Sequence, residues 1–202
     1  MAARLLAPAR AASIIRMQEV VATRLRLEVV ANIGDSSPRE ALDRWLEFVW
    51  NDGGGLPVIG IPLQRDFGDS VTNICEKLLF PSAVKERLQK VDRIACQVSY
   101  IVSNPGPLTY PVAEHAAEVS FVRNDEGELE LRWAVEIVPL DGWEGIVKPF
   151  TQWSVESVAR NFQTTPTRVK RRGVYQLPDA SRDEFMWHGT PVGFRARWTE
   201  VP

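Results

Sequence analysis

Two neighbouring segments, 113–121 and 129–137, alternate between apolar and polar residues, and this pattern constrains the fold more than any other feature of the chain. In the first segment, one parity consists of Ala113, His115, Ala117, Val119 and Phe121. In the second, it consists of Leu129, Leu131, Trp133, Val135 and Ile137. A period of two is typical of a β-strand with one buried face. The segments therefore predict two paired strands with a common apolar face.

A helical pattern follows this strand pair after a turn at 139–143. Its apolar positions are Trp153, Val155, Val158, Ala159 and Phe162, which recur at helical spacing. Pro149 fits the first turn of such a helix, where no backbone N–H is needed. An antiparallel sheet whose apolar face is covered by one helix forms a container for an apolar ligand. The pattern does not indicate which ligand is held, or whether chemistry happens inside.

A second helix is predicted directly after a first strand at 23–33. Ser37 is typical of an N-cap, Pro38 of the first helical position, and Glu40 completes a capping box. The expected buried stripe is Ala41, Leu42, Trp45, Leu46 and Val49. Three glycines at 53–55 follow this helix, whereas a phosphate-binding loop precedes one. We interpret them as a helix stop.

Three more strands are predicted between the two helices, at 70–78, 84–92 and 93–103. A turn at 80–82 and the glycine-containing turns at 104–107 and 124–127 separate the strands. Strands joined by such short turns are antiparallel neighbours. The chain is thus expected to fold as an α+β protein.

The overall composition argues against several classes of partner. With 24 Lys and Arg against 26 Asp and Glu, the formal charge is −2, so no strong field favours nucleic acid. Cys75 and Cys96 lie among apolar or strand-like neighbours without the close Cys and His spacing of a zinc site, which predicts reduced, buried thiols. No stretch approaches the roughly 20 apolar residues of a membrane span. Neither a metal nor another cofactor is expected.

The ends of the chain differ from its middle. Arg4, Arg10 and Arg16 precede the first acidic residue, Glu19, a composition typical of either a transit peptide or a disordered tail. We expect a cytoplasmic protein, with organelle import as the alternative. The expected organisation is an N-terminal segment 1–22, a domain 23–163 and an arm 164–202. Alternation at 194–199 suggests that the arm ends in a strand or an extended segment, which wraps the domain or contacts a partner.

The order of elements resembles the helix-grip fold of the START and polyketide cyclase superfamily, also called SRPBCC. The likeness covers about 23–163 and rests on the entry 33–42, the strand 94–102 with its turn 103–107, and the strand 131–137 before Pro139. It implies an α+β fold with a curved antiparallel sheet of about six to seven strands wrapped around a long C-terminal helix. It also implies an apolar ligand between that helix and the sheet. The superfamily has no common catalytic signature, so no catalytic residue is transferred.

Two residues are candidates for catalysis inside this container. His115 shares the inner parity with Val119, so its imidazole could act as a general acid or base on a carbonyl compound. It could equally be a histidine whose hydrogen bonds are satisfied by the backbone. Tyr100 shares parity with Val98, so its phenol could donate to a ligand oxygen or to an internal partner.

Aromatic and β-branched residues are candidates for ligand contacts. Trp133, Trp143 and Trp153 are expected to line or cap the cavity, although a tryptophan at such positions is also common in an ordinary core. Val119, Phe121 and Val135 are the further expected ligand contacts.

Two functional hypotheses follow from the resemblance and these candidates. The first is a polyketide-cyclase-like enzyme in which His115, with Tyr100, polarises or deprotonates a bound carbonyl compound for cyclisation or dehydration. The second is a non-enzymatic carrier of a lipid, sterol or pigment. Both take a small hydrophobic molecule as partner and no nucleic acid, and they leave peripheral membrane contact and the oligomeric state open.

Overall fold

The computed structural model describes residues 23–34, 37–54, 59–65, 74–80, 82–164 and 194–201. The predictions for 1–22 and for the basic part of the arm lie outside these ranges. Within them, no helix combines the length and the apolar character that a bilayer span requires.

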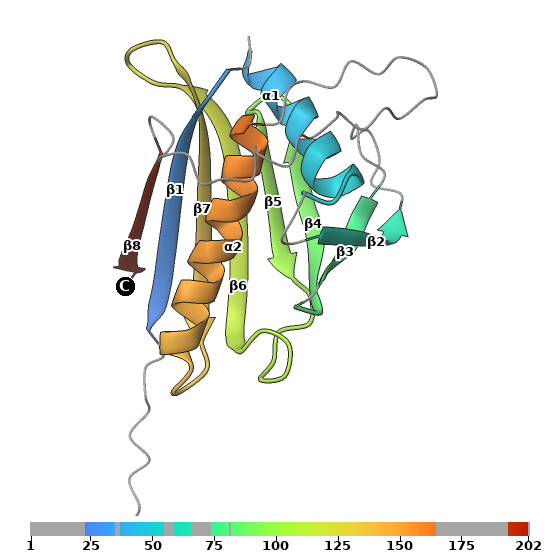
Figure 1. Ribbon diagram of the computed structural model, residues 1–202, viewed down its shortest axis with the longest axis vertical. Coiled ribbons are helices and arrows are strands. Elements are labelled where there is room, and N and C mark those ends of the chain that lie inside the picture. The colour runs from blue at the N-terminus through green and yellow to red at the C-terminus, as the bar shows by residue number, and fades with distance from the viewer. Residues whose placement is uncertain are drawn as a thin grey trace, which may run out of the picture.

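An eight-stranded antiparallel sheet curves around a long helix (Figure 1). Its spatial order is β2-β3-β4-β5-β6-β7-β1-β8. The strands are β1 (Arg24–Ile33), β2 (Ile59–Arg65), β3 (Ile74–Phe80), β4 (Val84–Asp92), β5 (Gln97–Val102), β6 (Val112–Arg123), β7 (Leu129–Pro139) and β8 (Arg195–Val201). The predicted α+β class, with a curved antiparallel sheet and a C-terminal helix, is confirmed, and the sheet has more strands than expected.

The sheet is covered on its inner face by two helical segments (Figure 1). The first is α1 (Pro38–Trp45), which continues as a π-helical segment, η1 (Leu46–Asn51), and the second is α2 (Glu144–Thr164). The predicted cap of α1 is confirmed, because Ser37 Oγ accepts from the backbone N–H of Glu40 at 3.2 Å. The π-helical turns of η1 were not predicted from the helical pattern.

The helix α2 begins earlier than the sequence predicts. Glu144 is its first residue, so Pro149 lies in the second turn and not in the first. Because proline has no backbone N–H, the carbonyl of Gly145 lacks its usual intrahelical partner there. At the N-terminal end of the helix, the carbonyl of Trp143 accepts from the N–H groups of Ile146 and Val147 at 3.0 Å each.

Trp45 is the centre of the hydrophobic core between the helices and the sheet. Its side chain is fully buried, and its ring centre lies 4.9 Å from that of Trp133 and 5.1 Å from that of Phe162. Both contacts have the edge-on geometry that aromatic pairs favour. Trp45 therefore joins α1 to β7 and to the C-terminal half of α2. All five residues of the stripe predicted for this helix are buried: Ala41, Leu42, Trp45, Leu46 and Val49.

The strands in the middle of the chain differ in part from their predicted bounds. β4 agrees with the prediction, β3 begins at Ile74, and β2 was not predicted. The strand expected from residue 93 begins only at Gln97, because Asp92 Oδ1 accepts from the N–H groups of Ile94 and Ala95 and turns the chain. Ile94, which lies within the strand predicted at 93–103, is consequently outside β5 and 98% exposed.

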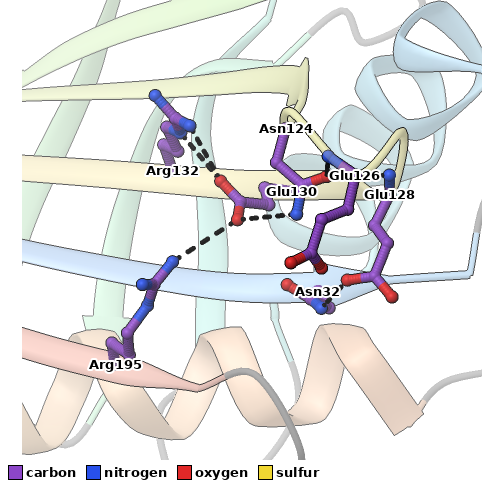
Figure 2. Close-up of polar contacts among 7 residues, drawn as sticks. All are labelled: Asn32, Asn124, Glu126, Glu128, Glu130, Arg132 and Arg195. Atoms are coloured by element: carbon purple, nitrogen blue, oxygen red, sulfur yellow. Dashed lines mark hydrogen bonds and ion pairs between the residues drawn. The ribbon is translucent and has the colours of Figure 1, made fainter.

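β8 lies within the predicted arm and pairs with β1 at the edge of the sheet. On the outer face of the sheet, Arg195 of β8 reaches Glu130 of β7 (Figure 2). Glu130 is only 3% exposed, and it also accepts from Arg132 and Asn124. On the inner face, Trp198 Nε1 donates to Gln152 Oε1 of α2 at 3.0 Å. These contacts fix the last described residues to the same sheet as β1.

Candidate ligand-binding site

A cavity lies between the N-terminal half of α2 and the inner face of the sheet. Its volume is about 60 Å³, and one side is open. Leu79, Phe150 and Ser154 line it and are only partly buried, as are Glu86 and His115, so the open side lies where β3 and β4 face α2. The other lining residues are Val49, Gly53, Val84, Glu86, Tyr100, Val102, Tyr110, His115, Trp133, Thr151, Val155 and Val158. The lining is mainly apolar and aromatic, as in small-molecule sites generally.

His115 lies on β6 at the point where the pairing with β5 ends. The last paired residues are Tyr100 and Ala117, and the same register places Val102 opposite His115. The Val102 N–H donates to Nδ1 of the imidazole at 3.2 Å, so the side chain replaces a backbone acceptor. Burial lowers the pKa of His115 to about 4, and the neutral ring with Nδ1 as acceptor carries its proton on Nε2. At neutral pH, His115 can therefore donate from Nε2.

A β-bulge sets the start of this strand. The pairing of β6 with β7 shifts by one residue between Val112 and Glu114. Ala113, predicted to face the apolar side, is therefore exposed, whereas Val112 is buried. The bulge lies two residues before His115, and beyond it the alternation follows the predicted parity.

Two tyrosines flank His115 inside the cavity. The ring centres of Tyr100 and Tyr110 lie 5.9 Å and 5.8 Å from that of His115. Burial raises the pKa of Tyr100 well above its usual range, and the nearby Trp133 indole opposes the rise. Burial likewise raises the pKa of Tyr110. Both phenols therefore stay protonated at neutral pH.

Tyr110 is hydrogen-bonded to a residue of α2. Its hydroxyl bonds to Thr151 Oγ1, and Thr151 Oγ1 donates to the carbonyl of Val147 at 2.7 Å. Because the threonine proton is used in that bond, Tyr110 is the donor to Thr151. This chain of hydrogen bonds holds the helix against the loop before β6.

Trp133 lines the cavity with a buried indole ring. Its side chain is 5% exposed, and its indole N–H has no hydrogen-bond partner within the ranges that the structure describes. The nitrogen atom is itself buried, and it lies near enough to the Tyr100 phenol to oppose the rise in the pKa of that group.

A buried ion pair lies at the β3–β4 side of the cavity. Lys77 Nζ is 3.2 Å from Glu86 Oε2, donates to the carbonyl of Val49 at 3.1 Å, and lies 4.4 Å from the centre of the Trp50 ring. Burial lowers the pKa of Lys77, and the attraction of Glu86 opposes that change. Glu86 is among the residues that line the cavity, and Lys77 is not.

Close backbone contact at this side requires glycine. A Cβ on Gly60 would lie 2.9 Å from Cδ of Lys77, and one on Gly53 would lie 2.7 Å from the carbonyl oxygen of Gly60. Gly53 also has a φ of +86°, which residues with a side chain rarely adopt. The first glycine of the predicted helix stop thus both ends η1 and lets β2 pack on the stem of Lys77.

The structure brings together only some of the predicted site residues. His115, Tyr100 and Trp133 line the cavity. Val119, Phe121 and Val135 are buried in the core and do not line it. Trp143 is partly buried against the core near the start of α2, also outside the lining. Trp153 is 46% exposed and points away from the lining, although its ring contacts that of Phe150.

Sequence reasoning missed Glu86, Lys77 and Tyr110. A signal existed for Glu86, because Val84 and Leu88 of the same parity are both buried and flank it on the inner face. Lys77 likewise shares its face of the strand with Cys75 and Leu79, and the register pairs it directly with Glu86. A charged residue inside an apolar alternation was the available sign.

Comparisons with known proteins show the fold. No family model matches the chain, and no curated protein sequence matches it. Among solved structures, Ara h 8.0201 is 10% identical, with a TM-score of 0.54 over 69% of this chain and 95% of that one. XoxI from Bacillus cereus is 14% identical, with a TM-score of 0.50 over 68% of this chain and 92% of that one.

A further solved structure, norcoclaurine synthase from Thalictrum flavum, is 16% identical over 80% of this chain and 96% of that one. Its TM-score of 0.46 is too low to support a functional comparison. The predicted resemblance is confirmed at the level of the fold: the protein has the helix-grip fold of the SRPBCC and START-like superfamily.

Proposed function

We propose that the protein binds a small, largely apolar molecule between α2 and the sheet and holds it without transforming it. The observation that supports this proposal is the apolar, aromatic lining of the cavity, with a few polar side chains among it such as His115 and Tyr100. Apolar walls with a few polar groups that fix orientation are typical of binding sites for small molecules.

The hydrogen bonding of His115 favours binding over acid–base catalysis. A general base must have a free lone pair within reach of the ligand. The lone pair of Nδ1 already accepts from Val102, and Nε2 carries the proton. Tyr100, with its raised pKa, is likewise a donor at neutral pH. Both predicted catalytic residues therefore support a role in orienting a ligand.

The size of the cavity limits how the ligand is held. A volume of about 60 Å³ is well below the roughly 150 Å³ of an engineered cavity that holds benzene. A ligand larger than a few atoms therefore places one end inside and extends through the mouth, past Leu79 and Phe150. Such a ligand leaves part of its apolar surface at the mouth.

The proposal is tested by filling the cavity. Ser154 of α2 lines it and Ser157 of the same helix does not. We expect Ser154→Phe to abolish binding of 1-hexanol, a slim, mainly apolar probe whose alkyl end can enter a narrow cavity, followed by ligand-observed NMR. Ser157→Phe, the matched control, should leave binding unchanged. Equal binding by both variants, or no binding by the wild-type protein, would contradict the proposal.

The carrier and enzyme hypotheses are separated by a second measurement. Native mass spectrometry of freshly purified protein identifies any compound that copurifies, and the His115→Ala variant is then tested with that compound. For a binding protein we expect weaker binding and no conversion by either form. Conversion by the wild-type protein that the variant loses, with binding retained, would favour the cyclase-like enzyme.

A further inference from the structure

Large apolar side chains are exposed around the open side of the cavity. Four of them form what we call the apolar rim: Leu108 is 98% exposed, Ile146 60%, Phe80 57% and Trp153 46%. They are half of the eight large apolar residues that are exposed in the described part of the chain. None of the four lines the cavity, so a ligand inside it leaves them uncovered. Exposed apolar side chains that gather in one place mark an interaction surface, whereas single ones do not.

The elements that carry the rim contact one another. The loop between β5 and β6, which carries Leu108, lies at the same end of the molecule as the start of α2 (Figure 1). Asn104 of this loop donates to the carbonyl of Ala83, in the turn after β3, at 3.1 Å. At the other end of the loop, Tyr110 bonds to Thr151 of α2. The β3–β4 turn, the β5–β6 loop and the N-terminal half of α2 therefore form one connected border.

The rim is continuous with the cavity. Ile146, Phe150 and Trp153 lie on one side of α2, at the spacing i, i+4 and i+7. Phe150 lines the cavity, and its ring centre lies 6.1 Å from that of Trp153. Phe80 ends β3 directly after Leu79, another lining residue. A molecule that covers the rim therefore also covers the mouth.

The charges near the rim do not select an ionic partner. The charged residues in the first two turns of α2 are Glu144 and Lys148, and they pair with each other at 3.4 Å. The whole chain has a formal charge of −2. Such a balance attracts neither nucleic acid nor anionic lipid. A partner of the rim must therefore bind mainly through apolar contact.

A second copy of the chain would need a larger surface than the rim provides. A standard protein interface buries about 800 Å² on each partner, whereas a fully buried aromatic side chain contributes about 150 to 250 Å². Only one of the four rim residues is almost fully exposed, so the rim falls well short of that area. It is also divided among a turn, a loop and a helix around an opening. Fluid lipid adapts to such a shape without a matching protrusion.

We infer that the apolar rim inserts into the surface of an uncharged lipid bilayer, so that the mouth of the cavity faces the acyl chains. Trp153 combines an apolar ring with a polar N–H, which suits the boundary between headgroups and acyl chains. A ligand then enters the cavity from the bilayer without crossing water. The inference adds a partner to the proposed function and rests on it only for this entry step.

Flotation of the full chain with vesicles of pure phosphatidylcholine tests the inference by measuring a partition coefficient. We expect Leu108→Ser to lower this coefficient about tenfold, because burial of a leucine side chain contributes at least that factor. The matched control is Ile94→Ser, which changes an equally exposed residue before β5, whereas Leu108 follows that strand. The control should partition like the wild-type protein. Equal losses in the two variants, or no partitioning of the wild-type protein, would overturn the inference.

A second measurement places Trp153 directly. Phosphatidylcholine with brominated acyl chains quenches only tryptophans that reach the bilayer. We expect it to quench the wild-type protein and to quench Trp153→Phe much less, because the other tryptophans of the described ranges are buried or partly buried. Equal quenching of the two proteins would contradict insertion of the rim.

The other possible partners give distinct results. Partitioning into phosphatidylcholine should be the same at low and high salt. Binding that requires phosphatidylserine and disappears at high salt would assign the contact to the basic residues of 1–22 or 165–193, and it would overturn the inference. A dimer that Leu108→Ser dissociates in sedimentation velocity would overturn it too, since a second copy would then cover the rim.

Binding of 1-hexanol separates this inference from the proposed function. Leu108 does not line the cavity, so Leu108→Ser should bind 1-hexanol as the wild-type protein does. A wild-type protein that binds 1-hexanol but not vesicles overturns the inference alone. A wild-type protein that binds vesicles through the rim but not 1-hexanol contradicts the proposed function and supports the surface inferred here.

Discussion

The two faces of the sheet contain similar charged residues in different surroundings. On the inner face, Lys77 and Glu86 form one ion pair, with side chains 4% and 13% exposed, beside an apolar cavity of about 60 Å³. The outer face has a groove of about 280 Å³ across β1, β6, β7 and β8. Its charged lining residues are Arg26, Glu28, Glu118, Glu130, Arg132 and Arg195.

The difference is one of solvation. On the outer face most of the paired groups reach water: Arg195 is 72% and Arg132 53% exposed, although Glu130 between them is only 3% exposed. Such pairs contribute little because water screens them and their side chains lose entropy. On the inner face, loss of one partner leaves a charge without water or counter-charge. Stability should therefore depend on the inner pair, whereas the outer residues serve mainly to keep that face polar.

The largest effect is expected when the inner pair is broken. Lys77→Met removes the ammonium group and leaves Glu86 buried without its partner. We expect the free energy of unfolding to fall by about 3 to 5 kcal/mol, measured by urea denaturation. The control is Lys90→Met, which breaks a pair with Asp92 whose lysine is 67% exposed. A similar loss in both variants would remove the distinction between the faces.

The second-largest effect is a pH dependence of the stability that arises from His115. The pKa is about 4 in the folded protein and about 6.5 when unfolded, so the unfolded chain binds more protons between these values. The contribution of His115 to the free energy of unfolding is therefore fully present above pH 6.5. It is lost as the pH drops toward 4, by at most about 3 kcal/mol. Urea denaturation at several pH values should show this loss in the wild-type protein and a reduced loss in His115→Gln. Identical profiles would contradict the assignment.

A smaller effect is expected at the contact between Tyr110 and Thr151. Thr151→Val keeps the shape of the side chain but leaves the buried Tyr110 hydroxyl without its acceptor. The expected cost is about 1 to 3 kcal/mol in a thermal or urea denaturation. The double variant Tyr110→Phe/Thr151→Val should recover much of that loss. On the other face, Thr199→Val of β8 should change stability by less than about 0.5 kcal/mol.

The smallest effect is expected on the outer face. Arg195→Ala removes one of two arginines from Glu130, while Arg132 stays at 2.9 Å (Figure 2). We expect a loss of less than about 1 kcal/mol, which should shrink further in 1 M salt. Urea denaturation at low and high salt measures the loss of stability and its dependence on salt. A cost near that of Lys77→Met, independent of salt, would show that Glu130 behaves as an inner-face charge.

Regular patterns made most of the fold predictable. The alternation of 129–137 and 113–121 gave β7 and most of β6, and the capping box gave the start of α1. The errors lie where local interactions break a pattern. The Asp92 carboxylate turns the chain at Ile94, and a bulge places the Ala113 side chain on the exposed face instead of the apolar one. The π-helical turns of η1 occur in an apolar run that also suits an α-helix.

The site was predictable only in part, for the same reason. Parity placed His115, Tyr100 and Trp133 on the inner face, and all three line the cavity. It could not separate residues that line the cavity from residues that fill the core, such as Phe121, because both have the same parity. Nor could it exclude Trp153, since helical spacing alone does not decide which part of a helix extends beyond the sheet.

The sequence by itself determined which faces of the strands and helices are apolar, because side-chain direction follows the backbone period in every strand and helix. Only the tertiary structure decided that Lys77 meets Glu86, that Val102 donates to His115, and that the Trp133 indole packs edge-on against Trp45. These contacts join residues that are 9, 13 and 88 positions apart, and they depend on strand register and on how the helices pack on the sheet. Register and helix placement arise from the packing of the whole core, which no local pattern encodes.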